Sequence, residues 1–274
     1  MTSETLIRLG VFLGILVIMG LLEVMAPRRP PSVSKARRWF CNLGIVVVDT
    51  IVVRLAVPAA AVGAAVMAQQ NEWGILNQFA IPTVFAYVAS VVILDLLVYF
   101  QHVAFHAFPV LWRVHRMHHS DRDLDASSGL RFHPIEIVLS MVIKMLAVIS
   151  IGAPAGAVLI FEVLLNATAV FNHSNVSIPN SIDRVLRWIL VTPDMHRVHH
   201  SVVPIETDCN FGFNLPWWDR LFGTYQPQPA AGHEGMVVGL ADYQDDRPQR
   251  LSWMLVFPFL SETAFRGRKD IRPE

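Results

Sequence analysis

Histidines at helical spacing are the residues of this sequence best suited to carry chemistry. On an α-helix, positions i, i+3 and i+4 lie on one face, so imidazoles at that spacing point in one direction. Eight of the chain's eleven histidines follow this spacing. They are His102 and His106, then His115, His118 and His119, and finally His196, His199 and His200. The sequence therefore predicts three helices that each present imidazoles on one face.

The number of imidazoles indicates two metal ions rather than one. Neutral imidazole suits zinc, copper, iron and nickel, and four to six ligands saturate any of these ions. The Glu-x-x-His pairs of soluble di-iron bundles and the His-Glu-x-x-His motif of zinc proteases are both absent. The pattern therefore favours two redox metals held almost entirely by histidine. The alternative is that histidines are scattered on surface helices. It does not explain three sets at helical spacing, which we call the histidine boxes.

Carboxylates near the boxes are candidates for orienting the imidazoles and balancing the charge of the metals. Asp95 lies seven residues before His102, which is roughly 10 Å away on the same helical face. We consider it a candidate catalytic residue that handles protons, and the alternative is a buried carboxylate bonded to a neighbouring helix. We expect one or two of four further carboxylates to bond a ligand: Asp121, Asp123, Asp194 and Asp208.

The composition is that of a membrane protein. Of the 274 residues, 53% are hydrophobic and only 16% are charged, whereas a soluble domain is about 25% charged. The net charge is zero, so nothing points to nucleic acid. The two cysteines, Cys41 and Cys209, imply no disulfide framework.

Apolar runs predict an all-α, polytopic membrane bundle with about four to five transmembrane or re-entrant helices. About 20 apolar residues cross a bilayer, and residues 6–26, 43–68 and 79–101 each have that length. Two further runs, 135–152 and 155–171, are separated by glycine and proline and predict a helical hairpin. Spanning helices would therefore alternate with turns over residues 6–171.

We expect one integral membrane domain over residues 1–274. It divides into N-terminal transmembrane helices at 1–78, a catalytic region at 79–226 and a C-terminal tail at 227–274. The tail's apolar run at 253–260 is too short to span and is expected at the membrane interface.

The basic segment at residues 27–38 sets the expected orientation. It carries five lysines and arginines, which places it in the cytoplasm by the positive-inside rule. Counting spans from there brings all three boxes back to the cytoplasmic side, as a histidine-rich helical cap. The hairpin's second arm emerges on that side at His173, which makes a ninth candidate ligand.

The three boxes resemble those of the fatty acid hydroxylase superfamily, also called the sterol desaturase family. Further matching motifs are Arg131-Phe132-His133-Pro134, Asn172-His173 and the segment from Trp218 to Tyr225, so the resemblance covers roughly residues 90–226. It implies an integral membrane di-iron oxygenase. It also implies that the metal ligands are His102, His106, His115, His118, His119, His173, His196, His199 and His200.

Two positions of the motifs leave roles open. His133 matches the His-Pro motif and is a candidate catalytic residue, a further ligand or a helix-start residue. Position 169 is alanine, whereas some members have a further histidine there, so the tenth ligand stays open and a water or Asn166 could take its place.

The expected function is O2-dependent hydroxylation of a C–H bond in a membrane lipid. This reaction requires two iron ions, O2 and electrons from a separate electron-transfer protein. The alternatives are a lipid desaturase on the same site, a non-enzymatic metal-handling membrane protein and a zinc hydrolase. The lipid, the donor, the regiochemistry and the oligomeric state stay open.

Overall fold

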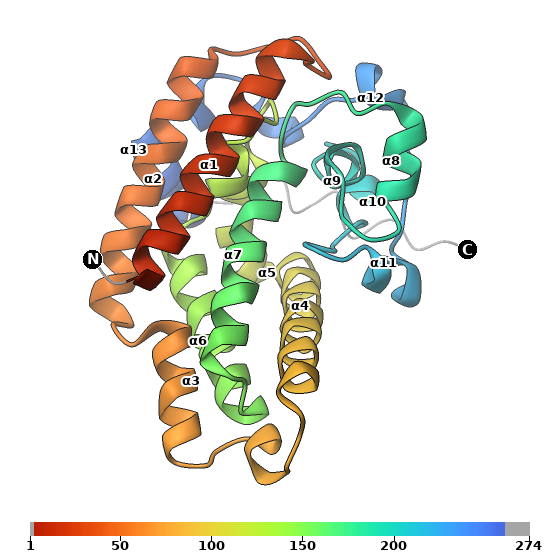
Figure 1. Cartoon of the computed structure of the whole chain (residues 1–274). Coiled ribbons are helices and arrows are strands. Elements are labelled where there is room, and N and C mark those ends of the chain that lie inside the picture. Colours follow the sequence, from red (N-terminus) through yellow and green to blue (C-terminus); the bar gives the residue numbers. More distant parts are fainter. Residues whose placement is uncertain (1–2, 261–274) are drawn as a thin grey trace.

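Long apolar runs form the main helices of the structure, a computed structural model that describes residues 3–260. By length and composition, five helical segments of the described part are able to cross a membrane. They lie at Glu4–Met25, Lys35–Gln78, Thr83–Ala107, Pro134–Ile151 and Ala155–Asn172. These residues contain no strand, and the helices pack as one bundle (Figure 1). The prediction of an all-α polytopic membrane bundle is confirmed.

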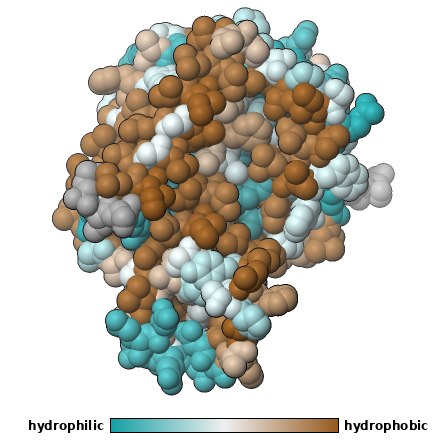
Figure 2. Space-filling model, viewed as in Figure 1, coloured by the Kyte–Doolittle hydropathy of each residue, from teal (hydrophilic) through white to brown (hydrophobic). Residues whose placement is uncertain are grey.

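The helices that build the bundle are α1 (Ser3–Met25), α2 (Lys35–Ala56), α3 (Ala60–Gln70), α4 (Thr83–Ala107), α6 (Pro134–Ile151) and α7 (Ala155–Asn172). Helix α7 packs against α1 and α4, and α6 packs against α2 and α3. The outward side chains of these helices are apolar, for example Leu21, Leu55 and Phe85. Figure 2 shows a broad hydrophobic face over this part of the molecule and a hydrophilic end below it. Such a surface suits contact with lipid.

The second predicted span, 43–68, is wrong as a single helix. Helix α2 ends at Ala56 and α3 begins at Ala60. Between them Pro58 has no N–H to donate, and its ring clashes with a carbonyl one turn earlier. Val57 has left the helical region, at φ −140° and ψ 66°, and Ala60 has φ 50°. The proline therefore divides the apolar run into two helices.

Small residues let α3 approach its neighbours closely. Ala61, Ala64 and Ala65 are fully buried and share a core with Val148 of α6 and Phe161 of α7. Van der Waals packing at such small-residue contacts is what holds helices together in lipid.

The predicted hairpin is confirmed, with α6 and α7 joined by a tight turn at residues 152–154. Gly74, at φ 91°, lies against this turn, and a Cβ there would be 2.1 Å from the nitrogen of Gly152. Only glycine allows that approach in that conformation.

The other end of the bundle carries a cap of short elements. Its α-helices are α5 (Pro109–His119), α8 (Asn180–Leu186), α9 (Pro193–His199), α10 (Pro204–Thr207), α11 (Trp217–Phe222), α12 (Gly232–Gly235) and α13 (Leu251–Val256). The 3-10 turns are η1 (Ile75–Gln78), at the opposite end, and η2 (Ser128–Leu130), η3 (Ala241–Tyr243), η4 (Arg247–Gln249) and η5 (Phe257–Phe259).

The basic segment joins this cap, as the predicted topology requires. The Arg28 amide donates to the carbonyl of Asn175, and its guanidinium pairs with Asp194 at 3.1 Å. Asn175 lies two residues after His173, so the basic segment and the histidine boxes share one end of the bundle. Which side of the membrane this end faces stays a prediction.

The apolar run of the C-terminal tail packs on the protein. Met254 and Phe257 are fully buried, in one cluster with Ile45 of α2 and Met117 of α5. The tail is thus part of the core behind the second box, while its exposed side chains include Val256 and Phe259. Its position at the membrane interface stays a prediction. Residues 261–274 of the predicted tail lie outside the described residues.

Candidate metal centre

Local sequence signals place each histidine box on a helix end. Helix α4 runs unbroken through His102 and His106. Phe108 is extended ahead of Pro109, so α5 starts as a separate helix and carries the second box. The Thr192 side chain accepts from the Met195 amide and starts α9, which carries the third box. The predicted helix boundaries at the prolines are confirmed.

The nine predicted ligands come together in two groups. Within each group, the potential ligand atoms all lie within 4.8 Å of one another. All nine side chains are buried. One group contains His102, His106, His115, His119 and His199, and the other contains His118, His173, His196 and His200. We call them the five-histidine group and the four-histidine group.

The two groups are in direct contact. The rings of His119 and His200, one from each group, are stacked with centroids 4.5 Å apart. Adjacent residues of the boxes belong to different groups, as with His118 and His119 or His199 and His200. Consecutive side chains on a helix point about 100° apart, so each of these boxes serves both groups. Two metal sites would therefore be neighbours.

Oxygen acceptors fix the tautomer of most of these imidazoles. A carbonyl or carboxylate oxygen has no proton to give, so a ring nitrogen bonded to it is the N–H donor. Six of the nine candidate ligand histidines donate from Nδ1 in this way. The acceptors are the carbonyls of Phe211 for His102 (2.8 Å), Arg131 for His118 (3.1 Å), Ala169 for His173 (2.8 Å) and Cys209 for His199 (2.7 Å), with Glu136 for His115 (2.7 Å) and Asp208 for His106 (3.1 Å).

The Nε2 lone pairs of these rings then point into the two groups. His118 Nε2 and His173 Nε2 are 3.1 Å apart, and neither carries a proton to share. In the five-histidine group, the Nε2 atoms of His102, His115 and His199 are buried without a hydrogen-bond partner among the described residues. Buried, unpaired acceptors are costly, and lone pairs facing each other at this distance repel. A bound cation would satisfy both conditions, so the donor set fits a metal in each group.

Burial keeps the imidazoles in the neutral form that binds metal. It lowers the pKa of His173 to about 4 and that of His199 to about 3. Burial, reinforced by the neighbouring imidazoles, holds the pKa of His118, His196 and His200 well below the ordinary value of 6.5. Desolvation disfavours the charged form, which explains the direction. These groups therefore require no deprotonation before a metal binds at neutral pH.

One of the four carboxylates predicted to bond a ligand does so. Asp208 accepts from His106, as described above. Asp123 accepts from the Ser32 and Val33 amides, and Asp194 pairs with Arg28 and Arg197. Asp121 pairs with Arg38. These three instead hold the basic segment and the loop after α5, because arginines and amides reach them from distant parts of the chain.

The sequence analysis missed Glu136, whose carboxylate bonds His115. It lies in the first turn of α6, after the His-Pro motif, and is 4% exposed. An acidic residue three positions after His133, at the start of an apolar helix, was the available signal. Asn172 was also missed in this role, and its side-chain oxygen lies 2.6 Å from His173 Nδ1.

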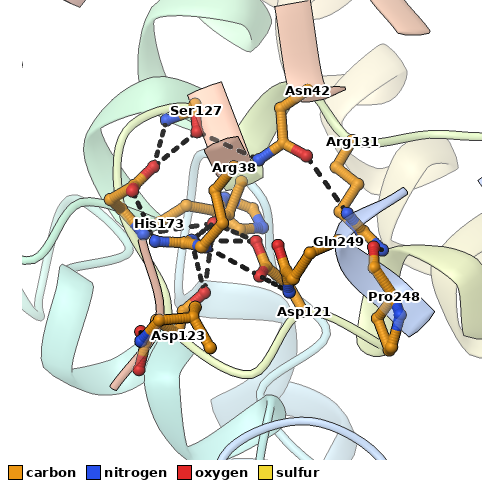
Figure 3. A network of polar contacts seen from close by, with 12 residues as sticks. Arg38, Asn42, Asp121, Asp123, Ser127, Arg131, His173, Pro248 and Gln249 are labelled. Carbon is orange, nitrogen blue, oxygen red and sulfur yellow. Dashed lines mark hydrogen bonds and ion pairs between the residues drawn. The ribbon is translucent and has the colours of Figure 1, made fainter. Parts of the chain in front are cut away.

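A buried network of arginines and carboxylates supports the four-histidine group (Figure 3). Arg38 of α2 forms two 2.9 Å bonds with Asp121 and one of 2.5 Å with Asp125. Burial alone would raise the pKa of the Asp121 carboxyl, but Arg38 holds it well below its usual range. Arg131 donates to the carbonyls of Met117 and Pro248, and its own carbonyl accepts from His118. The network thus ties α2, α5 and the tail to one metal-facing histidine.

The loop at residues 208–225 lies against the histidines. The ring of Phe211 contacts His102, His106 and His199 at 5.1–5.5 Å between centroids. Asp219 accepts from the amides of Phe211 and Gly212 and thereby holds the loop in place. The loop supplies two of the carbonyls that orient the histidines.

The remaining candidates lie outside both groups. Asp95 accepts from the Trp218 indole at 2.8 Å and from the Leu215 amide, so it holds the 208–225 loop. His133 caps α6 by accepting from the Ile135 amide, and its Nε2 bonds the Leu255 carbonyl at 3.1 Å. Asn166 donates back to a carbonyl of its own helix. The structure brings none of the three to the cluster.

Comparison with known proteins points to one family. A family model described as fatty acid hydroxylase matches residues 87–224, which is 138 of the chain's 274 residues and includes all nine histidines. No solved structure matches the chain.

Curated relatives are lipid hydroxylases and monooxygenases. The ornithine lipid hydroxylase OlsE of Rhizobium tropici is 32% identical over 162 residues, covering 58% of this chain and 48% of that protein. Alkylglycerol monooxygenases of Xenopus tropicalis and Homo sapiens are each 32% identical, covering 47% and 52% of this chain and 28% and 30% of those proteins. The chain thus spans half or less of the length of these relatives. Together with five candidate spans, this kinship indicates an integral membrane protein.

Proposed function

Since the chain belongs to the fatty acid hydroxylase family, we propose that it is an O2-dependent di-iron hydroxylase of a membrane lipid. The observation that carries the proposal is the pair of adjacent, buried groups of imidazoles whose lone pairs converge. The relatives' names support insertion of oxygen over desaturation, and they support a lipid substrate.

In this proposal the nine histidines hold two iron ions, one in each group. The irons would supply the redox chemistry by which O2, two electrons and two protons convert a C–H bond to C–OH and water. The protein's residues hold the site for that chemistry. The Nδ1–H bonds keep each Nε2 aimed inward, and Glu136 and Asp208 place negative charge next to a site that neutral imidazoles leave cationic.

Other residues exclude water and position the groups. Phe132 stacks on His118 at 4.5 Å, and Trp112 packs on His106 at 4.9 Å between centroids. We assign Asp95 and His133 to positioning rather than to contact with substrate. Asp95 would hold the loop that orients His102, and His133 would fix the start of the helix that carries Glu136.

The electrons would come from a separate protein at the cytoplasmic face. The lysines and arginines of residues 27–38, which lie at the same end of the bundle as the histidines, support that orientation. The lipid would enter from the bilayer that surrounds the spans.

Metal content and Mössbauer spectroscopy on iron-57-grown protein in detergent test the proposal. We expect two irons per chain with a coupled diferric signal. The variant His118→Ala should lose both the coupled signal and the oxygenated lipid product. His233→Gln, at a histidine outside both groups, should keep both. Bound zinc with no coupled iron after anaerobic reconstitution would overturn the oxygenase in favour of a hydrolase or a metal-handling protein.

A further inference from the structure

An arginine-lined pocket lies on the cap, outside both histidine groups. Its volume is about 400 Å³, and three arginines line it: Arg184, Arg187 and Arg220. Asp183 is the one carboxylate among the described lining residues, and it pairs with Arg187 at 2.5 Å. Asp219, the neighbour of Arg220 in the chain, does not line the pocket, and its oxygens accept from the amides of Phe211 and Gly212. The lining therefore carries a net charge of about +2.

Two of these arginines have buried N–H groups with no hydrogen-bond partner in the described part of the chain. Arg187 is 5% exposed, and its Nη1 donates to the Pro227 carbonyl at 2.6 Å. Its Nη2 has no such partner, and neither does Nε of Arg220. Leaving a buried, charged donor unpaired is costly. A ligand with anionic oxygens in the pocket would balance the positive charge of these guanidinium groups, and a planar guanidinium suits phosphate in particular.

Aromatic rings hold Arg220 in place at this pocket. Its guanidinium lies 4.1 Å from the ring centroid of Trp188 and 4.0 Å from that of Tyr225. Its Nη2 donates to the Arg187 carbonyl at 3.0 Å. Arg220 is therefore preorganised, and a ligand need not pay the entropy of ordering it.

Exposed apolar side chains lie on the pocket lining at Trp188 and on residues close to lining residues in the chain, which indicates lipid rather than a soluble anion. Trp188 is 59% exposed, Ile189 58%, Trp217 45% and Leu221 68%. The Trp217 indole donates to the Trp188 carbonyl, so the two tryptophans form one surface. Tryptophan is enriched at the membrane–water interface, where its ring lies among headgroups. The cationic pocket and the apolar surface next to it together suit an amphiphile, a molecule with an anionic headgroup and an apolar tail.

The pocket is also continuous with the structure that supports the histidines. On α11, the ring of Phe222 stacks on Tyr99 of α4 at 5.4 Å, one turn before His102. Asp219, next to Arg220, holds the Phe211 amide, and the Phe211 carbonyl accepts from His102. A ligand in the pocket would therefore contact elements that position the five-histidine group.

We propose that this pocket binds the phosphate of an anionic membrane lipid headgroup, with Trp188 and Trp217 lying among the neighbouring lipids. Binding there requires neither metal nor O2, so it stands or fails apart from the proposed hydroxylase activity.

The test is native mass spectrometry of the full chain released from detergent with phosphatidylglycerol or phosphatidylcholine. We expect the wild type to retain phosphatidylglycerol at least tenfold better. The variant R184Q/R220Q should weaken that binding about 25-fold, because each arginine at an anionic lipid surface contributes about fivefold. R184Q alone, at an exposed position, should weaken it about fivefold, and R250Q, an exposed arginine outside the lining, should not change it.

Inorganic phosphate added at millimolar concentration distinguishes a lipid headgroup from free phosphate as the ligand of this pocket. We expect it to leave the bound lipid in place. Displacement of the lipid by phosphate, with no preference for phosphatidylglycerol, would overturn the lipid assignment in favour of a soluble phosphate site. Equal retention of both lipids by wild type and R184Q/R220Q, at unchanged metal content and thermal stability, would overturn the site altogether.

Discussion

Removing the Glu136 carboxylate should weaken metal binding in the five-histidine group alone. Glu136 accepts from His115 Nδ1 at 2.7 Å, and the two side chains are 5% and 3% exposed. This is the shorter of the two carboxylate bonds to the histidines, and Asp208, which makes the other at 3.1 Å, is 40% exposed. Water cannot readily replace a buried acceptor, so Glu136→Ala leaves the His115 N–H unpaired.

The size of the effect follows from that geometry. A buried hydrogen bond to a charged group contributes about 1.5–3 kcal/mol, and loss of such a partner lowers metal affinity about 10–100-fold. Glu136→Gln keeps an oxygen acceptor without the charge, so its loss of metal affinity should be about tenfold or less. Asp208→Ala should lower metal affinity less than Glu136→Ala does, because solvent reaches the Asp208 carboxylate.

The assay is titration of metal-free protein in detergent with Co²⁺ against a competing chelator. We expect one of two binding steps to weaken in Glu136→Ala and the other to keep its affinity. Glu234→Gln is the matched control, since that side chain is 88% exposed. The reasoning fails if both steps weaken equally, or if neither changes while the protein stays folded.

Two further predictions concern stability. Above pH 6.5, His173 and His199 are neutral in both the folded and the unfolded chain. As the pH falls from 6.5 toward 4, these histidines become protonated in the unfolded chain but stay neutral in the folded chain, because burial lowers their pKa. Thermal unfolding of metal-free protein should therefore reveal a loss of about 1.4 kcal/mol per pH unit for each histidine, and a flat profile would contradict the burial argument. Gly129→Ala would place a Cβ 2.2 Å from the carbonyl oxygen of Ala169, the acceptor for His173. It should cost about 1–3 kcal/mol and empty the four-histidine group. Gly10→Ala, inside α1 with nothing within 4 Å of its Cβ, should keep or slightly raise the stability in the same melts.

Local signals were enough to predict the helices and the ligands' relative spacing. An i, i+3, i+4 pattern has one geometric meaning on a helix, so the boxes at 102–106, 115–119 and 196–200 could be read directly. Proline constrains the backbone at its own position and the one before it, which explains why the breaks at Pro109 and Pro134 were predictable. Pro58 also predicts a helix break, but it lies inside an apolar run whose hydropathy indicated one continuous span.

What the sequence determined by itself was the set of nine histidines, their helices and the end of the bundle where they meet. The tertiary structure alone decided how they divide into five and four. Neighbouring residues such as His118 and His119 belong to different groups because the packing of the helices gives each ring different neighbours. The ring of His118 contacts His173, directly after α7, and the ring of His119 contacts His199 of α9. The tertiary structure also decided that Glu136 and the carbonyls of the 208–225 loop orient the rings. Contacts between residues far apart in the chain depend on how whole helices pack, and no local pattern encodes that.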